Sequence, residues 1–397
     1  MQIVALGKQD VYLTGNPQFT YFKVIYRRHT NFATESIMVH WDSNTETPEL
    51  GATLTATIPR QAELVNGIWL QVALPFEDGS SAKWIDGVGN ALVKRADIEI
   101  GGHLVDRHYG EWMNIWGELT TPQGKLEGYD KMVGNNTNLV AATAQRLDIP
   151  LLFWFCRNPG LALPLVALQN TEVKLKIQLE TEANLISEAG TLTSPEAMEM
   201  KLWVDYVFLD TDERRRFSQV SHEYLIEQLQ VNNFTVGTNE TTNKRCELWF
   251  DYPIKEFNWV IHTPGDDLFD FNNSFDTAKF ELDSRVVVPS RRPEYYLQIE
   301  NYTHHQRVPR YDGITGATAV DPEDTPVTYF RKQKIYTYSF ALTPENHQPS
   351  GSANFTRIDT AVLSIKNLAN AQTVAVYATN YNILRFMAGA ANLSFSV

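Results

Sequence analysis

The chain has 397 residues, of which 43% are hydrophobic and 12% aromatic, and its formal net charge at pH 7 is −13. This length suits two domains, and this apolar content excludes an intrinsically disordered chain. Binding to nucleic-acid phosphates depends on clustered Lys and Arg, so the acidic balance predicts no direct nucleic-acid partner.

The first predicted element is an amphipathic helix over residues 17–26. Pro17 suits a first helical turn. Aromatic side chains follow at helical spacing with basic side chains beside them, which gives a set of six residues: Phe19, Phe22, Lys23, Tyr26, Arg27 and Arg28. The residues before Pro17 lack the pattern of a signal peptide, and no apolar run is long enough to span a bilayer, so neither is expected.

Short runs of alternating apolar and polar residues dominate the rest of the chain and predict half-buried β-strands. The clearest run is 172–180, where Val173, Leu175, Ile177 and Leu179 share one face. Further predicted strands cover residues 52–58, 68–74, 96–100, 202–209, 245–250, 257–262, 278–282, 335–342, 360–366, 373–378 and 382–387. This is enough for two β-sandwiches of about eight strands each.

Helical patterns are few. Residues 106–119 place Tyr109, Trp112 and Trp116 on one face, with Asp106 as the expected N-cap. Residues 212–219 predict a charged helical turn or short helix. Many strands with helices confined to their connections indicate an all-β protein and not an alternating βαβ sheet.

The most charged stretch, residues 210–223, lies near the midpoint of the chain. It is either a solvated surface loop or the linker between two halves, and its position favours the linker. We therefore expect a first domain over residues 1–210, a linker over 211–224 and a second domain over 225–397. Ion pairs within the charged stretch are expected to fix the angle between the halves, through Asp212, Glu213, Arg214, Arg215 and Arg216.

The two halves also share a faint internal repeat. Residues 158–177 and 348–366 each contain a Pro/Gly turn, about a dozen mixed residues and an alternating strand. The match is loose, but it is consistent with two copies of one sandwich.

The N-terminal segment QDVYLTGNPQFTYFKVIYRRHTNFATESI, residues 9–37, is more specific than any periodicity. It resembles the N-terminal signature of major capsid proteins of nucleocytoplasmic large DNA viruses, particularly those of algal viruses and iridoviruses. Further blocks resemble the family in the same order, at residues 99–116, 159–175, 204–230, 338–365 and 380–393. Together these blocks span nearly the whole chain.

The resemblance implies two consecutive eight-stranded jelly rolls. It also implies a homotrimer whose six barrels imitate a hexagon, and capsomers of this kind tile an icosahedral shell. The implied partners are further copies, neighbouring capsomers, minor capsid proteins under the shell and an inner viral membrane. The implied location is the virion, assembled in the host cytoplasm. Two alternatives stay open: a minor capsid paralogue, because loops in both halves look short, and a carbohydrate- or receptor-binding jelly roll.

Three interpretations of the N-terminal arm also stay open. The six aromatic and basic residues contact neighbouring subunits or inner shell proteins, since aromatics and Arg anchor interfaces. Alternatively, residues 17–26 form a helix that packs on its own barrel. In the third, Lys23, Arg27 and Arg28 contact anionic lipid headgroups.

The sequence predicts no enzyme: it has no HExxH, GxSxG, P-loop or GxGxxG motif, and we expect no catalytic residue, cofactor or metal. A jelly-roll enzyme of the cupin type would need a His/Glu metal set that is not visible. The pair His304 and His305 is expected to lie in a surface loop. Cys156 and Cys246 are expected to be reduced, buried thiols, although one disulfide between them stays open.

Seven Asn-x-Ser/Thr sequons occur in the chain. A glycan needs an exposed asparagine, and Asn239, Asn272 and Asn301 lie in predicted loops, so they are the candidate glycosylation sites. Asn354 and Asn392 fall in or near predicted strands and are poor candidates.

Overall fold

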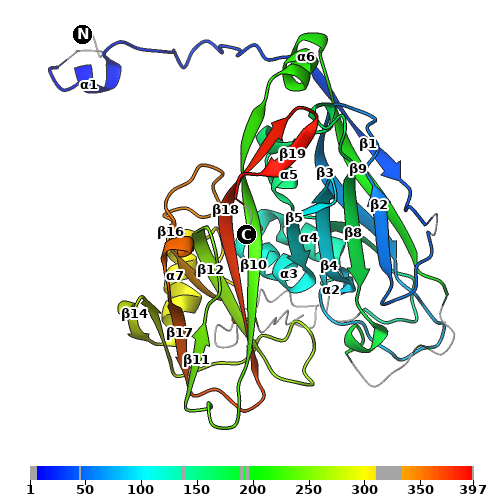
Figure 1. Ribbon diagram of the computed structural model, residues 1–397, viewed down its shortest axis with the longest axis vertical. Helices are drawn as coiled ribbons and strands as arrows, with labels where there is room; N and C mark the ends of the chain where they lie inside the picture. The colour runs from blue at the N-terminus through cyan, green and yellow to red at the C-terminus, as the bar shows by residue number, and fades with distance from the viewer. Residues whose placement is uncertain are drawn as a thin grey trace, which may run out of the picture.

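The computed structural model describes residues 7–43, 46–135, 139–187, 192, 196–309 and 333–395. Within them the chain forms two β-sandwiches side by side (Figure 1). The first sandwich contains β1 (Phe32–Val39), β2 (Thr53–Thr57), β3 (Leu64–Ala73), β4 (Val93–Ile100), β5 (His103–Tyr109), β6 (Arg146–Pro150), β7 (Leu163–Pro164), β8 (Val173–Leu179) and β9 (Glu199–Leu209).

The second sandwich contains β10 (His222–Thr235), β11 (Asn243–Glu247), β12 (Pro253–His262), β13 (Thr277–Leu282), β14 (Arg285–Arg291), β15 (Tyr336–Ser339), β16 (Ala353–Asn354), β17 (Ala361–Lys366), β18 (Thr373–Met387) and β19 (Ala390–Leu393).

Apart from α1 in the N-terminal arm, the helices occupy the connections between strands. The α-helices are α1 (Val11–Thr14), α2 (Val88–Leu92), α3 (Gly110–Thr120), α4 (Gln123–Val133), α5 (Trp154–Arg157), α6 (Thr211–Gln219) and α7 (Glu300–His304). The 3-10 turns are η1 (Pro159–Leu161), η2 (Leu165–Ala167), η3 (Glu182–Asn184) and η5 (Phe355–Arg357), and η4 (Tyr295–Ile299) is a π-helical segment.

The strand order is the same in both sandwiches. The first has sheets β1-β9-β3-β6 and β2-β8-β4-β5, and the second has β10-β18-β12-β15 and β11-β17-β13-β14. Without the short strands β7, β16 and β19, each sandwich therefore joins its first strand to its eighth and its second strand to its seventh. This antiparallel order is that of a jelly roll, so the predicted double jelly roll is confirmed.

The internal repeat predicted from the sequence corresponds to equivalent segments of the two barrels. In the first barrel β7 pairs with β3, and in the second β16 pairs with β12, which is again the third main strand. Each short strand is followed by a 3-10 turn, η2 or η5, and then by the seventh main strand, β8 or β17.

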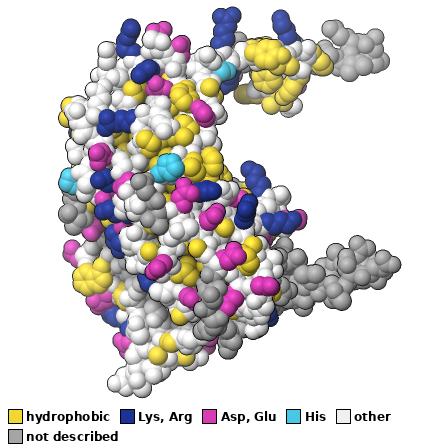
Figure 2. Space-filling model, turned by 90° about the vertical axis from the view of Figure 1, so that its right-hand side faces the viewer, with side chains coloured by type: hydrophobic (Ala, Val, Ile, Leu, Met, Phe, Trp, Pro, Cys, Tyr) yellow, Lys and Arg dark blue, Asp and Glu magenta, His cyan; other side chains and the backbone are white. Residues whose placement is uncertain are grey.

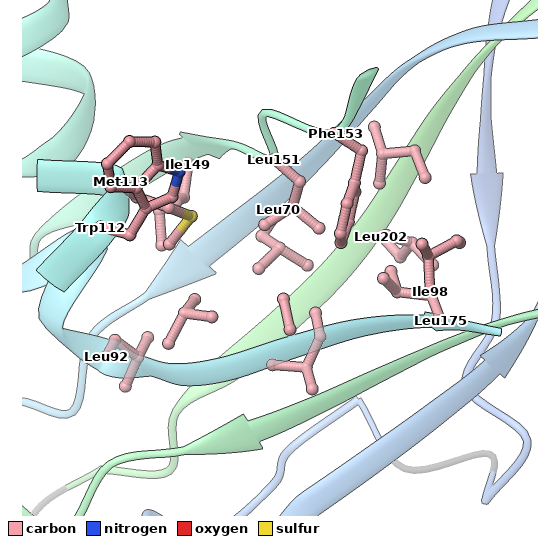
Figure 3. Packing of buried hydrophobic residues seen from close by; sticks show 14 of the residues in the cluster. Leu70, Leu92, Ile98, Trp112, Met113, Ile149, Leu151, Phe153, Leu175 and Leu202 are labelled. Atoms are coloured by element: carbon pink, nitrogen blue, oxygen red, sulfur yellow. The ribbon is translucent and has the colours of Figure 1, made fainter. Parts of the chain in front are cut away.

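Each barrel has a core between its two sheets. In β8, Val173, Leu175, Ile177 and Leu179 are all buried, as their alternation predicts. Figure 3 shows Leu175 in the first core together with Leu202 and the side chains Trp112 and Met113 of α3. The core of the second barrel centres on aromatic side chains of its strands, including Phe257, Trp259 and Phe280.

Two helix predictions need correction. The predicted helix 106–119 begins only at Gly110, and Asp106 lies in β5 instead of capping a helix. Gly110 allows this sharp change from strand to helix, because a Cβ there would lie 2.2 Å from the carbonyl oxygen of Asn90. Residues 17–26 form no helix; the only helix in the described part of the arm is α1.

Candidate assembly surfaces

The two barrels are joined by a buried ionic contact. Arg157, at the end of α5, places Nη1 3.0 Å from Oε2 of Glu227 on β10. The other Glu227 oxygen, Oε1, lies 2.7 Å from Nζ of Lys255 on β12. All three side chains are mostly or fully buried, and Lys255 is 0% exposed. One carboxylate therefore links a cation of the first barrel to a cation of the second.

Further interactions satisfy these two cations. Lys255 Nζ also donates to the carbonyl of Pro344, at 2.7 Å. The ring of Trp116, on α3, lies 4.2 Å from the Arg157 guanidinium and 5.5 Å from Lys255 Nζ. An indole face attracts cations, so Trp116 stabilises both charges away from water.

His305 extends this network within the second barrel. Its Nε2 lies 3.2 Å from Oε2 of Glu256 and its Nδ1 lies 3.0 Å from Oε1 of Glu345, and the ring is fully buried. Burial opposes the charged ring, but the two carboxylates, Glu256 first, outweigh it and raise the pKa of His305 to about 9. The prediction that His304 and His305 lie in a surface loop is wrong. His304 is the last residue of α7, and His305 is buried between the two carboxylates.

Helix α3 and strand β5 supply further contacts between the barrels. Glu111 Oε1 lies 2.7 Å from Nε2 of His262 on β12, and the ring of Trp112 stacks on Tyr377 of β18 at 5.7 Å. Asp106 accepts a hydrogen bond from the Leu229 backbone N–H on β10. Gln228 donates from its side chain to the carbonyl of Val105.

Two polar contacts join α3 to the second barrel, one to the residues just before β15 and one to the residues just after α7. Asn114 Nδ2 donates to Oε1 of Gln333 at 3.0 Å. Arg307 forms an ion pair with Glu118. The interface therefore continues along the whole length of α3.

The predicted junction residues lie on α6, between β9 and β10. Asp212, Arg214, Arg215 and Arg216 are exposed and Glu213 is half-buried. Arg214 Nε lies 3.3 Å from Oε1 of Glu63, a residue of the first barrel. This ion pair therefore joins α6 to the first barrel and not to the second. Along the chain, α6 lies between the last strand of the first barrel and the first strand of the second, whereas the buried contacts between the barrels come from residues elsewhere in the chain.

The N-terminal arm leaves the first barrel at β1 and projects away from both barrels (Figure 1). Figure 2 shows its hydrophobic side chains standing clear of the body, beside Lys and Arg side chains. Phe22 is 99% exposed, and the rest of the predicted set is exposed as well: Phe19, Lys23, Tyr26, Arg27 and Arg28. A helix packed on its own barrel is therefore the wrong interpretation of this segment.

The three candidate glycosylation sites differ in exposure. Asn239 is exposed in a turn, and Asn272 is half-buried. Asn301 was wrongly assigned to a loop: it lies in α7, is 0% exposed and donates from Nδ2 to the carbonyls of Leu297 and Ile335. A glycan on that nitrogen has no space and would break both hydrogen bonds.

Among the described residues, no group of three or more His, Cys, Asp or Glu side chains is placed to hold a metal ion. Cys156 and Cys246 are both free thiols, and burial raises the pKa of each to about 12. No helix in the described ranges is long and apolar enough to cross a membrane.

Comparison with known proteins identifies the family. The description "Major capsid protein N-terminus" matches residues 20–210, and "Large eukaryotic DNA virus major capsid protein" matches residues 213–318 and 318–392. A major capsid protein of Pyramimonas orientalis virus is 42% identical over 405 residues, with 100% of this chain and 98% of that protein covered. This chain belongs to the major capsid protein family of large eukaryotic DNA viruses.

Other members of the family agree in sequence and fold. The major capsid protein of Paramecium bursaria Chlorella virus 1 is 32% identical over 462 residues, with 100% of this chain and 98% of that protein covered. The solved structure of VP54 from the same virus, fitted into a reconstruction of the virophage Sputnik, has a TM-score of 0.81 at 28% identity and covers 95% of this chain and 100% of its own. The Faustovirus major capsid protein, at 11% identity and a TM-score of 0.71, shares the fold.

The sequence contained one overlooked indication of the interface in this capsid-family chain. Lys255 and Glu256 interrupt the otherwise mainly apolar strand β12, and both are fully buried. Adjacent charges inside such a strand are costly unless each is paired, so they indicate partners from other parts of the fold. Arg157, Glu227 and His305 had no comparable local signal.

Proposed function

We propose that this chain is a structural protein of a viral capsid, and that three copies form a capsomer with a pseudo-hexagonal outline. The observation that carries the proposal is the pair of barrels with identical strand order, held together by a buried ionic interface. Two similar barrels in fixed orientation are what a trimer with six barrels requires. The family to which the chain belongs supports the same role.

The most abundant shell protein is a better match than a minor paralogue. The sequence suggested a paralogue because its loops look short. The relative from Pyramimonas orientalis virus, which is named a major capsid protein, aligns over 405 residues with 98% of its length covered. It therefore has nearly the same length as this chain, and a short chain is compatible with the major role.

The remaining partners follow from surfaces that the barrels leave uncovered. The N-terminal arm carries exposed aromatic and basic side chains, and we assign it to contacts with neighbouring capsomers or with minor capsid proteins under the shell. Contact of Lys23, Arg27 and Arg28 with an inner viral membrane is the second candidate. The charged residues of α6 adjust the orientation of the barrels. The proposed location is the virion, assembled in the host cytoplasm.

Light scattering coupled to size-exclusion chromatography tests this function on the purified chain. A capsomer predicts a particle of about three times the mass of the chain, and electron microscopy should show a hexagonal outline. A chain that stays monomeric at every concentration would be incompatible with the proposed capsomer.

A further inference from the structure

The two barrels have the same strand order, so each has a set of equivalent faces. In the second barrel, the outward face of the sheet β10-β18-β12-β15 is covered by the first barrel. Tyr377 of that face stacks on Trp112 of α3, and His262 pairs with Glu111. Within the described ranges, this contact is the only one in which a barrel of this type packs on another.

The equivalent sheet of the first barrel, β1-β9-β3-β6, has an apolar row across its outward face. Strand register aligns Met38 with Trp203, Trp203 with Trp69, and Trp69 with Pro150. Trp69 is 36% exposed and the other three residues are half-buried. The row therefore crosses all four strands and remains accessible to a partner.

Polar residues border this row on both sides. Trp69 Nε1 donates to Oδ2 of Asp205 at 2.7 Å, and Trp203 Nε1 lies 3.3 Å from Oε1 of Gln71. The indole N–H groups are thus already satisfied by residues of the same face, which holds both rings in place. An apolar centre with a polar rim is the usual arrangement of a protein–protein interface.

The first barrel covers its neighbour with its fifth strand, β5, and with the helix that follows, α3. The equivalent elements of the second barrel are β14, η4 and α7. They carry large exposed apolar side chains, at 46% for Val286, 37% for Val287, 57% for Ile299 and 81% for Tyr302. Figure 1 shows β14 on the side of the second barrel away from the first, and β1 at the opposite side of the molecule.

We propose that the Met38–Trp203–Trp69–Pro150 face of one copy binds the β14–α7 side of a second copy, head to tail. The inference rests on the proposed capsomer and assigns its contact surfaces. Each copy offers one face of each kind that the described residues leave uncovered, and the two faces lie at opposite sides, so the contact repeats until a ring closes. A ring of three copies then has six contacts between barrels: three within the chains and three equivalent ones between neighbouring chains.

Two single substitutions test the assignment, one on each surface: Trp69→Arg and Tyr302→Arg. Thr53→Arg is the matched control, because Thr53 is exposed on β2, in the other sheet of the first barrel. Val287→Arg is a second variant on the β14 side. Mass is measured by light scattering over a concentration series, and circular dichroism checks that each variant is folded.

Each interface variant is expected to weaken association by more than about tenfold and to give a folded monomer, whereas Thr53→Arg assembles like the unmodified chain. A head-to-tail contact also predicts complementation. In an equal mixture, the intact face of Trp69→Arg binds the intact face of Tyr302→Arg, which gives a particle of two copies that cannot close into a ring.

The outcomes separate the inference from the proposed function. If the unmodified chain forms trimers and both interface variants do so equally well, the surface assignment is wrong and the capsomer stands. If Trp69→Arg alone disrupts assembly, the contact joins two β1 sheets and is not head to tail. If the unmodified chain never associates, the capsomer and the surface assignment fail together.

Discussion

Arg157 in the first barrel and Glu227 in the second form a mostly buried ion pair, with Nη1 and Oε2 3.0 Å apart. Because Glu227 also binds Lys255, its removal leaves two buried cations without their carboxylate. We predict that Glu227→Gln lowers the free energy of unfolding by about 3 kcal/mol, as expected when one partner of a buried ionic network is lost. The midpoint of urea unfolding measures this change.

The same strand provides the control for Glu227. Glu223 pairs with Arg385 at 2.6 Å, but both side chains are about half exposed. Glu223→Gln should therefore change the free energy of unfolding by less than about 1 kcal/mol. Equal effects of the two substitutions would show that burial at Glu227 does not matter and that the barrels are joined in another way.

His305 predicts a loss of stability at alkaline pH. Its pKa, about 9 in the folded chain, lies above the unfolded value of about 6.5, so the stabilisation is complete below pH 6.5 and is lost as pH rises through about 9. This shift corresponds to about 3 kcal/mol. Deprotonation leaves Glu256 and Glu345 facing a neutral ring inside the protein.

Unfolding midpoints between pH 7 and pH 9.5 test the role of His305. The unmodified chain should lose stability across this range, whereas His305→Gln should start less stable and show a flatter profile. The exposed His29→Gln is a control that should keep the original profile. An unchanged slope in His305→Gln would assign the alkaline loss to other groups.

The N-terminal arm is expected to serve assembly and not folding. Deletion of residues 1–31 removes an arm in which residues 11–31 are all exposed, so the free energy of unfolding should change by less than about 0.5 kcal/mol. Capsomers should still form, because their contacts lie on the barrels, but their assembly into larger shells should fail. Electron microscopy of assembly reactions measures this.

Two results would contradict the assignment of the arm. The first is a truncated chain that no longer folds, which would give the arm a role within its own barrel. The second is a truncated chain that builds shells as well as the full chain. Flotation with anionic vesicles tests the membrane interpretation separately. That interpretation predicts that the double substitution Arg27→Ala and Arg28→Ala abolishes binding to the vesicles.

Glycosylation should follow exposure and not the presence of a sequon. In a glycosylating host, peptide mass spectrometry should find any glycan at Asn239 before Asn272, and none at Asn301, whose side chain is buried and bonded to two carbonyls. Thr303→Ala removes the Asn301 sequon and should leave the glycan pattern unchanged. A glycan at Asn301 would mean that α7 is accessible during or after folding.

The sequence predicted those strands whose two faces differ in polarity. β8 alternates cleanly and was found almost to the residue. β1 and β10 were missed because most of their side chains are exposed or half-buried on both faces, which leaves no apolar period. β5 was missed because two of its polar side chains are buried: Asp106 bonds to Leu229 of the second barrel, and His108 stacks on Phe153 of the first. In sequence, such buried polar residues look like exposed ones.

The interface between the barrels was beyond local patterns for a related reason. Arg157 and Glu227 are 70 residues apart, and Glu111 and His262 are 151 apart, so nothing near either residue indicates its partner. The charged stretch on α6 attracted the prediction because it is dense in charge. A high density of charge indicates an exposed segment, whereas charges inside an apolar strand, such as Lys255 and Glu256, indicate the buried network.

The central claim is that this chain builds the shell of a virion, and its copy number in the virion is the most direct test. Quantitative mass spectrometry of purified virions should find this chain as the most abundant protein, in a constant ratio to the genome. Absence from the virions, or only a few copies in each, would contradict the account.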